Sequence, residues 1–196
     1  MIILASASKQ RCRLLTQIGI EPYVFSVPID EHFDGIDLAS EIQTVAERKV
    51  DAVAAKVRAE KHLSKSDHWI VGADTVILHD HQIYGKPKNA EDAVAMIKMH
   101  SGKTHDVMTG ICVRHFFTDR TVSAVCETTV EFSDLSQDTV NWYVSTGEWR
   151  DAAGGYRIQG RGACLVRAIH GSYSNVVGLP LELIYGMLRE LDYRFR

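Results

Sequence analysis

Two serines and two basic residues follow the first apolar segment of the chain. Residues 2–5 are apolar, Ser6 and Ser8 come next, and Lys9 and Arg11 follow directly. A helix that begins at these serines presents unpaired backbone N–H groups, to which hydroxyls and basic side chains add donors. Basic residues in a first turn oppose the helix dipole, so their position favours a bound anion such as phosphate. A capped helix with solvated basic side chains explains the same residues and stays open as the alternative.

One aspartate interrupts a segment that is otherwise strongly apolar. Asp74 lies within residues 69–78, a predicted strand rich in Trp, Ile and Val. Burying a carboxylate is costly unless it binds a metal, a cation or a proton. The preceding Gly72 and Ala73 are small and leave room for a ligand to approach the backbone. We therefore favour a functional role for Asp74 over an aspartate at a bulge or an exposed strand end.

Further charged residues fit a triphosphate site with a metal ion. Magnesium is usually held by one or two carboxylates together with substrate phosphates, which makes Glu31 and Asp74 a candidate pair. Asp30, beside Glu31, offers the same chemistry, although an acidic dipeptide in a loop is usually solvated. Two lysines are candidates only as part of such a pocket: Lys49, in a predicted helix, and Lys86, in a predicted hairpin arm. By themselves they are typical of surface lysines with partly covered stems.

A glycine-rich segment over residues 151–162 has the composition of a ligand-binding loop. Glycines let a backbone lie close to a planar ligand, and Gln159 offers a donor and an acceptor for the edge of a base. An ordinary flexible loop is the competing interpretation. Elsewhere, residues 101–104 resemble the end of a P-loop, but Ile97 stands where the first glycine is required.

Two other patterns are interpreted without a ligand. His79 and His81 flank Asp80 in a predicted hairpin turn with no third metal ligand nearby in sequence, so we interpret this segment as a polar turn. The four cysteines form no C-x-x-C pair and are expected to be reduced, partly buried thiols.

Apolar periodicity and turn residues predict the elements that must position these side chains. The predicted strands cover 2–5, 23–27, 69–78, 83–85, 104–114, 122–132 and 163–169. The predicted helices run from a cap at Ser6 or Ser8 to Gly19, over 38–61, 90–99 and 137–145, and onward from Pro180. Helices and hairpins are mixed, which predicts an α/β or α+β fold with a mixed sheet.

Composition limits the kind of protein further. The 196 residues carry 22 Lys and Arg against 25 Asp and Glu, a formal charge of −3, and 45% of them are hydrophobic. This composition predicts one globular domain over 1–196 without a basic surface for nucleic acid. The sequence shows no membrane-length apolar segment and no signal-peptide pattern, so a cytoplasmic location is expected.

Eight short blocks in a fixed order resemble the Maf family of nucleoside triphosphate pyrophosphatases over essentially the whole chain. The blocks are Leu4-Ala5-Ser6-x-Ser8 with Arg11 and Leu14-Leu15, Asp30-Glu31, Ala46-x-x-Lys49, Gly72-Ala73-Asp74-Thr75-Val76, Gly85-Lys86-Pro87, Ser101-Gly102-x-x-His105-x-Val107-x-Thr109-Gly110, Ala153-Gly154-Gly155-Tyr156-x-Ile158-Gln159-Gly160, and Gly171-Ser172-Tyr173 through Val177-Gly178-Leu179-Pro180-Leu181.

The resemblance implies a fold and a reaction. The fold is α/β, an elongated mixed β-sheet flanked by helices, with two lobes and a central cleft, as in inosine triphosphate pyrophosphatases. The reaction is hydrolysis of a nucleoside triphosphate between the α and β phosphates with a divalent cation, Mg²⁺ or Mn²⁺, and the resemblance also suggests a homodimer. Asp74 matches the proton acceptor and, with Glu31, the metal-binding position. The matching phosphate-binding positions are Ser8, Arg11, Lys49 and Lys86.

The substrate implied is a pyrimidine nucleotide. Residues 158–160, with Gln159, and the pair Asp74-Thr75 resemble the branch that acts on dTTP and UTP, rather than the branch with a Ser-Glu-Gly triplet that acts on 7-methyl-GTP. Lys9-Gln10 replaces the family's Pro-Arg, with Gln10 at a specificity position, and Ala152 replaces a lysine. These departures leave modified pyrimidine triphosphates open as substrates. A nucleotide-binding regulator of cell division that does not hydrolyse its ligand is the alternative from another functional class.

Overall fold

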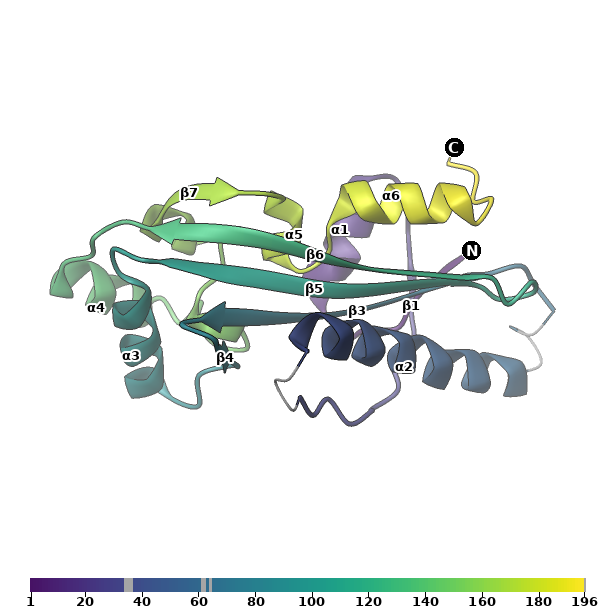
Figure 1. Ribbon diagram of the computed structural model, residues 1–196, viewed down its shortest axis with the longest axis horizontal. Coiled ribbons are helices and arrows are strands. Elements are labelled where there is room, and N and C mark those ends of the chain that lie inside the picture. Colours follow the sequence, from purple (N-terminus) through teal and green to yellow (C-terminus); the bar gives the residue numbers. More distant parts are fainter. Residues whose placement is uncertain (34–36, 61–62, 64, 196) are drawn as a thin grey trace. The chain divides into compact units, whose positions relative to one another are not determined.

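A seven-stranded sheet runs through the computed structural model, which describes residues 1–33, 37–60, 63 and 65–195 (Figure 1). The strand order is β2-β1-β3-β5-β6-β7, and β4 pairs with β3. β1 is parallel to β2 and β3, whereas β4 is antiparallel to β3 and β7 to β6, so the sheet is mixed. The strands are β1 (Ile2–Leu4), β2 (Tyr23–Val24), β3 (Trp69–His79), β4 (Gln82–Tyr84), β5 (Thr104–His115), β6 (Thr121–Phe132) and β7 (Val166–His170).

Side-chain caps set where most of the longer helices begin. The helices are α1 (Lys9–Gln17), α2 (Leu38–Ala59), α3 (Ala90–His100), α4 (Gln137–Ser145), α5 (Tyr173–Val177) and α6 (Leu181–Glu190), with 3₁₀ turns η1 (Ala153–Gly155) and η2 (Arg161–Leu165). Ser8, Asp37, Asn89 and Ser136 each accept a hydrogen bond from a backbone N–H of the first turn that follows. Among the described residues, no helix combines the length and apolar composition needed to cross a bilayer.

The chain divides into two compact units, and three strands contribute to both. Unit 1 contains 1–74, 109–126 and 178–196, and unit 2 contains 75–108 and 127–177. β3, β5 and β6 pass from one unit into the other within their own lengths. The predicted α/β class with a mixed sheet and flanking helices is confirmed. A single domain over 1–196 stays a prediction.

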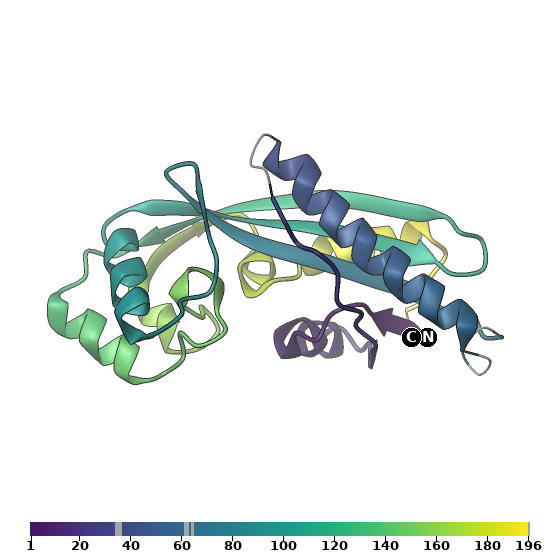
Figure 2. The ribbon, with the colours of Figure 1, turned by 90° about the horizontal axis from the view of Figure 1, so that it is seen from below.

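In unit 1, α2 packs against one face of the sheet and α6 lies on the opposite face (Figures 1 and 2). Gly72 and Gly110 allow α2 to approach closely, because a Cβ at Gly72 would lie 2.6 Å from the carbonyl oxygen of Ala46 and one at Gly110 would lie 2.3 Å from that of Ile42. The core beneath α2 contains Ile3, Ala5, Ala46, Val50, Val53, Ala54, Val57, Ile70, Cys112 and Phe116.

Unit 2 has its own core, to which α3, α4 and the segment around η1 contribute. Tyr143 of α4 is fully buried, and its hydroxyl accepts a hydrogen bond from the backbone N–H of Arg157 at 3.0 Å. The buried members include Ile77, Ala93, Ile97, Val107, Val130, Phe132, Val140, Trp149, Tyr156, Ile158 and Leu165. This core holds the glycine-rich segment, which is therefore packed over much of its length.

Most predicted elements are confirmed, and the differences have local causes. The strand predicted over 163–169 is wrong at its start, where η2 forms and places Leu165 fully inside the core; β7 follows from Val166. The strand predicted over 23–27 is shorter, covering only Tyr23–Val24. α2 ends at Ala59, and residue 61 of the predicted helix lies outside the described residues. The helix that follows Pro180 is confirmed as α6.

The predicted polar turn at residues 79–81 is wrong for His79. This residue ends β3 and is 2% exposed, with its ring centroid 5.2 Å from that of His100 and 6.3 Å from that of His105. His81 is exposed and lies in the turn, with a φ of 61°. The side chain of His79 is buried in unit 2, where it contacts the rings of His100 and His105, which are distant in sequence.

Candidate active site

Arg11 connects three segments of unit 1 at the start of α1. Its Nε donates to the carbonyl oxygen of Gly178 at 2.8 Å, and its Nη1 donates to Ser6 Oγ at 3.0 Å and to the carbonyl oxygen of Ala73 at 2.8 Å. Burial lowers the pKa of the guanidinium, while the charges of Asp74 and Glu31 oppose that shift. Arg11 thus places a cation beside the predicted catalytic strand and fixes the backbone of that strand next to Asp74.

Ser8 is the N-cap of α1, which confirms one of the two predicted cap positions, Ser6 and Ser8. Its Oγ accepts a hydrogen bond from the backbone N–H of Arg11 at 3.4 Å, and its own N–H donates to Ser6 Oγ at 3.3 Å. The first turn of α1 contains no acidic residue. The N-terminus of this helix therefore carries positive character from its backbone and from its basic side chains.

Lys49 brings the two predicted metal-binding carboxylates together. Its Nζ lies 2.6 Å from Asp74 Oδ1 and 2.7 Å from Glu31 Oε1, and it also contacts the carbonyl oxygen of Ala73 at 3.4 Å. The side chains of Lys49 and Asp74 are 10% and 12% exposed, whereas that of Glu31 is 51% exposed. The buried aspartate thus has a cation as its partner, and Lys49 is no surface lysine.

Local folding explains why these groups meet. Asp74 lies within β3, and Lys49 lies on the buried face of α2, the helix that packs against this part of the sheet. The small Gly72, two positions before Asp74, permits the close approach of α2 that brings the ammonium to the strand. Three segments distant in sequence therefore supply an acid, a cation and a half-exposed second acid.

The chemistry of these donors fits a divalent cation. Glu31 and Asp74 each direct a carboxylate oxygen at the same ammonium group, which shows that both can serve one cation. Oxygen ligands of this type suit Mg²⁺ or Mn²⁺, which are bound by few carboxylates together with phosphate oxygens. Each carboxylate also has a second oxygen besides the one that contacts Lys49.

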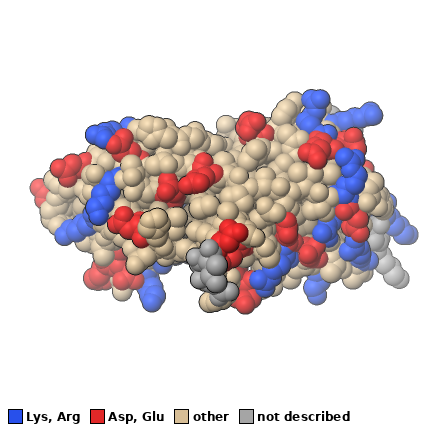
Figure 3. Space-filling model, viewed as in Figure 1, with Lys and Arg blue, Asp and Glu red and all other residues tan. Residues whose placement is uncertain are grey.

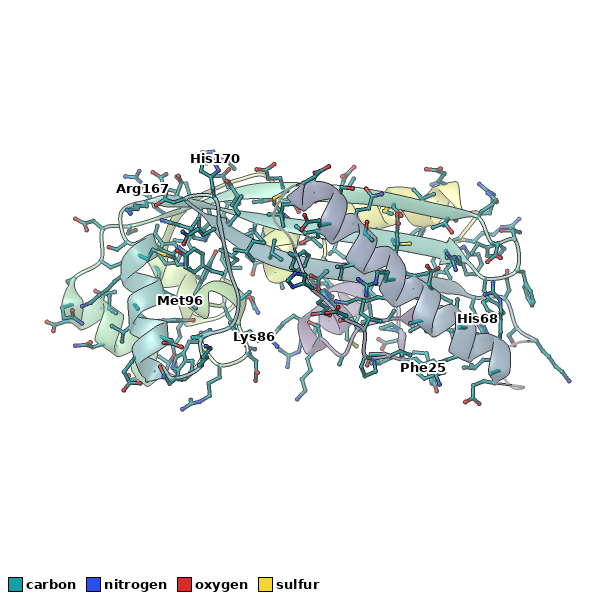
Figure 4. The ribbon with its side chains drawn as sticks, turned by 60° about the horizontal axis from the view of Figure 1, so that its bottom comes forward. Phe25, His68, Lys86, Met96, Arg167 and His170 are labelled. Atoms are coloured by element: carbon teal, nitrogen blue, oxygen red, sulfur yellow. The ribbon has the colours of Figure 1, made fainter. Side chains whose placement is uncertain are left out.

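The other predicted site residues are distributed over both units. Gln10 is half-buried on α1 in unit 1. Thr75 is in unit 2 on β3, and Lys86 is exposed on the segment after β4, where Figure 4 labels it. Gln159 is exposed in unit 2 and lines an open pocket of about 530 Å³ together with Tyr173. The structure thus joins Lys49, Asp74 and Glu31 by direct contacts. Arg11 adjoins them through the carbonyl oxygen of Ala73, which Lys49 also contacts, and Ser8 adjoins Arg11 through Ser6.

Sequence reasoning gave no role to one part of this arrangement, in unit 1, or to one buried polar residue of unit 2. The carbonyl oxygen of Gly178, which Arg11 holds, comes from a segment at the far end of the sequence, and no residue type marks it. Asn175 is fully buried, and its Nδ2 donates to the carbonyl oxygen of Val107 at 2.9 Å and to Thr128 Oγ1 at 3.0 Å. Both positions lie within the last of the eight blocks, from Gly171 to Leu181, which is the signal that pointed to this region without giving either residue a role.

Comparison with known proteins gives matches over almost the full length. The sequence model of the family described as Maf-like protein matches residues 1–191. A protein of Acetivibrio thermocellus named dTTP/UTP pyrophosphatase is 44% identical over 190 residues, covering 96% of this chain and 94% of the relative. Proteins with the same name from Symbiobacterium thermophilum and Pyrococcus abyssi are 40% and 39% identical over 98% and 96% of this chain and 94% and 95% of their own lengths. The chain therefore belongs to the Maf-like protein family.

Proposed function

We propose that this protein is a hydrolase that cleaves dTTP, UTP or closely related pyrimidine triphosphates between the α and β phosphates. The products are the nucleoside monophosphate and pyrophosphate. Relatives named dTTP/UTP pyrophosphatase, 44% and 40% identical over nearly the whole chain, support this substrate class. The observation that carries the reaction is the contact of Asp74 and Glu31 with the single ammonium of Lys49, beside the buried Arg11.

The charges of the cluster suit a metal–triphosphate ligand. Arg11 and Lys49 supply two positive charges, and Glu31 and Asp74 supply two negative charges. The two cations favour binding of the triphosphate and stabilise the charge that builds up on the departing pyrophosphate. A bound Mg²⁺ or Mn²⁺ would neutralise further phosphate charge at the two carboxylates.

Asp74 is the proposed proton acceptor. In the reaction a water oxygen forms a bond to the α-phosphorus, the bond from that phosphorus to the bridging oxygen breaks, and the water proton passes to the Asp74 carboxylate. Lys49 orients this carboxylate through the contact at 2.6 Å. Ser8, Lys86, Gln10, Thr75 and Gln159 remain predictions from the family resemblance, the first two as phosphate ligands and the others as determinants of the base.

Asp74→Asn tests the assignment directly. Loss of the proton acceptor is expected to lower kcat by about 10²–10⁴-fold. The protein should still fold, because Lys49 keeps Glu31 as its charged partner. Pyrophosphate release from dTTP and UTP with saturating Mg²⁺ is the measurement, and Asp138→Asn, an exposed acid on α4, is the matched control. Near-normal turnover in Asp74→Asn contradicts the role of Asp74.

A substrate panel tests the proposed class. We expect release of pyrophosphate from dTTP and UTP to exceed that from CTP and 7-methyl-GTP, with 5-methyl-UTP and pseudouridine triphosphate as the modified substrates. Removal of divalent cations with a chelator is expected to abolish release. Tight binding of dTTP or UTP without any pyrophosphate release favours the alternative, a nucleotide-binding regulator.

The remaining expectations about partners and location stay predictions. Acidic and basic side chains are interspersed on the face of the molecule shown in Figure 3. The formal charge of −3 agrees with a small anionic substrate handled by a local cluster of cations rather than by a basic surface. A homodimer, a cytoplasmic location and the lack of a nucleic-acid partner are expected from the sequence and its resemblance.

A further inference from the structure

Three buried histidines meet in unit 2, apart from the acidic and basic cluster of unit 1. His79 ends β3, His100 ends α3, and His105 lies near the start of β5. The three residues are 2%, 0% and 2% exposed. One ring nitrogen from each lies within 4.8 Å of those of the other two. Such convergence of three imidazoles is a geometry that transition metals use.

The hydrogen-bond partners of this histidine cluster are incomplete. Nδ1 of His79 lies 3.4 Å from Nδ1 of His100, and His105 Nε2 lies 2.8 Å from the hydroxyl of Tyr156. Within the described part of the chain, His105 Nδ1, which faces the other two rings, has no hydrogen-bond partner. An unsatisfied buried polar atom costs about 1–3 kcal/mol, so apolar side chains would fill this space more favourably unless a ligand is bound.

The protonation state of the rings suits metal binding. Burial, followed by the neighbouring His79, lowers the pKa of His100 to about 4, against a smaller opposing effect of the Gly154 backbone. Burial, followed by His100 and His79, lowers the pKa of His105 to about 2. Both imidazoles are therefore neutral at pH 7, which is the form that binds a metal.

We propose that His79, His100 and His105 bind a divalent first-row transition metal ion, with Zn²⁺ as the reference ion, through their Nδ1 atoms. In a tetrahedral site with Zn–N bonds of about 2.0–2.1 Å, two ligand nitrogens are about 3.4 Å apart. The observed separation of the Nδ1 atoms of His79 and His100 is 3.4 Å. The third Nδ1, on His105, is the ring nitrogen that Tyr156 leaves available.

The opposite ring nitrogens face groups of the kind that usually support metal ligands. His105 Nε2–H would donate to the Tyr156 hydroxyl at 2.8 Å, and His79 Nε2 lies 3.4 Å from Asp80 Oδ2. His100 Nε2 lies beside Gly154, where an added Cβ would be 3.4 Å away. Ligating histidines typically present their second nitrogen to a hydroxyl, carboxylate or backbone group, which fixes ring orientation.

The consequence for the fold is a cross-link within unit 2. A metal held by the three histidines would join the end of β3, the end of α3 and the start of β5. Through Tyr156 and Gly154 it would also hold the segment that contains η1 and, three residues beyond Tyr156, Gln159. The site is therefore structural in character and would stiffen a predicted base-binding segment.

Zinc binding to the full-length, chelator-treated protein tests this inference. Excess Mg²⁺ is present throughout, so that the carboxylates of Glu31 and Asp74 are occupied, and Zn²⁺ is titrated against a chromophoric chelator. We expect one Zn²⁺ per chain, a higher thermal unfolding temperature with Zn²⁺, and visible absorption typical of tetrahedral coordination with Co²⁺.

The variants are chosen so that the protein still folds. His79→Leu and His100→Leu replace imidazoles by apolar side chains in an apolar core, so we expect metal-free stability equal to or above that of the parent. Each should weaken Zn²⁺ binding by more than about 100-fold, and Tyr156→Phe by about 10–100-fold, because it removes only a supporting hydrogen bond. His81→Asn, in the adjacent turn at positive φ, is the matched control and should bind as the parent does.

Two results overturn the proposal. One is a parent protein that shows neither stoichiometric Zn²⁺ binding nor a Zn²⁺-dependent rise in unfolding temperature. The other is Zn²⁺ binding that survives unchanged in His79→Leu and His100→Leu, which places the ion elsewhere, such as at Glu31 and Asp74. Pyrophosphate release is measured separately, so failure here leaves the proposed hydrolase activity untouched.

Discussion

Lys49 holds two carboxylates with one ammonium group, and this makes it the residue on which the geometry of the candidate active site depends. Its contact with Asp74 is almost fully buried, whereas Glu31 keeps about half of its side chain exposed. Buried ion pairs contribute little net stability, but removing one partner leaves the other charge without compensation. The ion pair therefore fixes the position of Asp74, although two apolar side chains would stabilise this part of the fold at least as well.

A double-mutant cycle tests this dependence. Lys49→Met is expected to lower the free energy of unfolding by about 3–5 kcal/mol, because it leaves the buried Asp74 carboxylate unpaired. Adding Asp74→Asn to Lys49→Met should recover part of that loss, since a neutral amide is cheaper to bury. Urea unfolding measures the free energy of unfolding of each variant, and pyrophosphate release measures its activity. Additive effects in the cycle contradict a direct coupling of Lys49 and Asp74.

At the scale of elements, α2 positions Lys49 through its close contact with β3 and β5. Gly110→Ala would place a Cβ 2.3 Å from the carbonyl oxygen of Ile42, which is backbone and cannot move aside cheaply. We expect a loss of about 1–3 kcal/mol in the free energy of unfolding and reduced activity, because α2 must shift.

Gly186→Ala is the control for that prediction. Gly186 lies within α6 with nothing within 4 Å of an added Cβ, so alanine should stabilise the helix by up to about 1 kcal/mol. Urea unfolding of both variants decides the matter. Equal effects of the two substitutions would show that close packing at Gly110 does not limit stability.

Local patterns predicted the elements better than the contacts between them. The apolar period of the helix predicted over 38–61 is a property of residues close in sequence, and this helix and the one predicted over 137–145 are confirmed as α2 and α4. His79 was placed in a polar turn because its partner His100 is 21 positions away and no local pattern reveals it. Likewise, residue types suggested Arg11, Lys49 and Asp74 singly, whereas the carbonyl oxygens of Ala73 and Gly178 that Arg11 holds carry no type signal.

At the scale of the whole molecule, each unit buries at least one acidic proton in its core. Burial raises the pKa of Cys112 in unit 1 from 9.0 to about 11 and that of Tyr143 in unit 2 from 10.0 to about 12. The folded state therefore keeps these protons at pH values where the unfolded state releases them. Stability from this source is present below about pH 9 and is lost as pH rises.

Alkaline unfolding measures this effect. Each group is expected to lower the free energy of unfolding by about 2–3 kcal/mol as the pH rises through its window. The window is pH 9–11 for Cys112 and pH 10–12 for Tyr143. Cys112→Ala and Tyr143→Phe should each flatten the decline of the unfolding free energy with pH in its own window, whatever their effect at pH 7. A variant whose decline matches that of the parent contradicts burial of the corresponding proton.

Continuity of β3, β5 and β6 through both units determines how the molecule should unfold. Because each of these strands has residues in both units, loss of one unit removes hydrogen-bonded neighbours from the other. We therefore expect one cooperative transition, in agreement with the single domain predicted from the sequence. Tryptophans provide separate reporters: Trp69 belongs to unit 1, where its Nε1 donates to the carbonyl oxygen of Leu191, and Trp149 is buried in unit 2.

Two variants separate these signals. A chain with Trp142→Phe and Trp149→Phe reports unfolding of unit 1 through Trp69, and Trp69→Phe reports unfolding of unit 2. Each variant is unfolded in urea and followed by fluorescence and by far-ultraviolet circular dichroism, so that any shift caused by the substitution itself appears in both signals. The two signals should have the same midpoint within each variant. If fluorescence and circular dichroism separate in either variant, the units unfold independently, and the shared strands do not couple them into one domain.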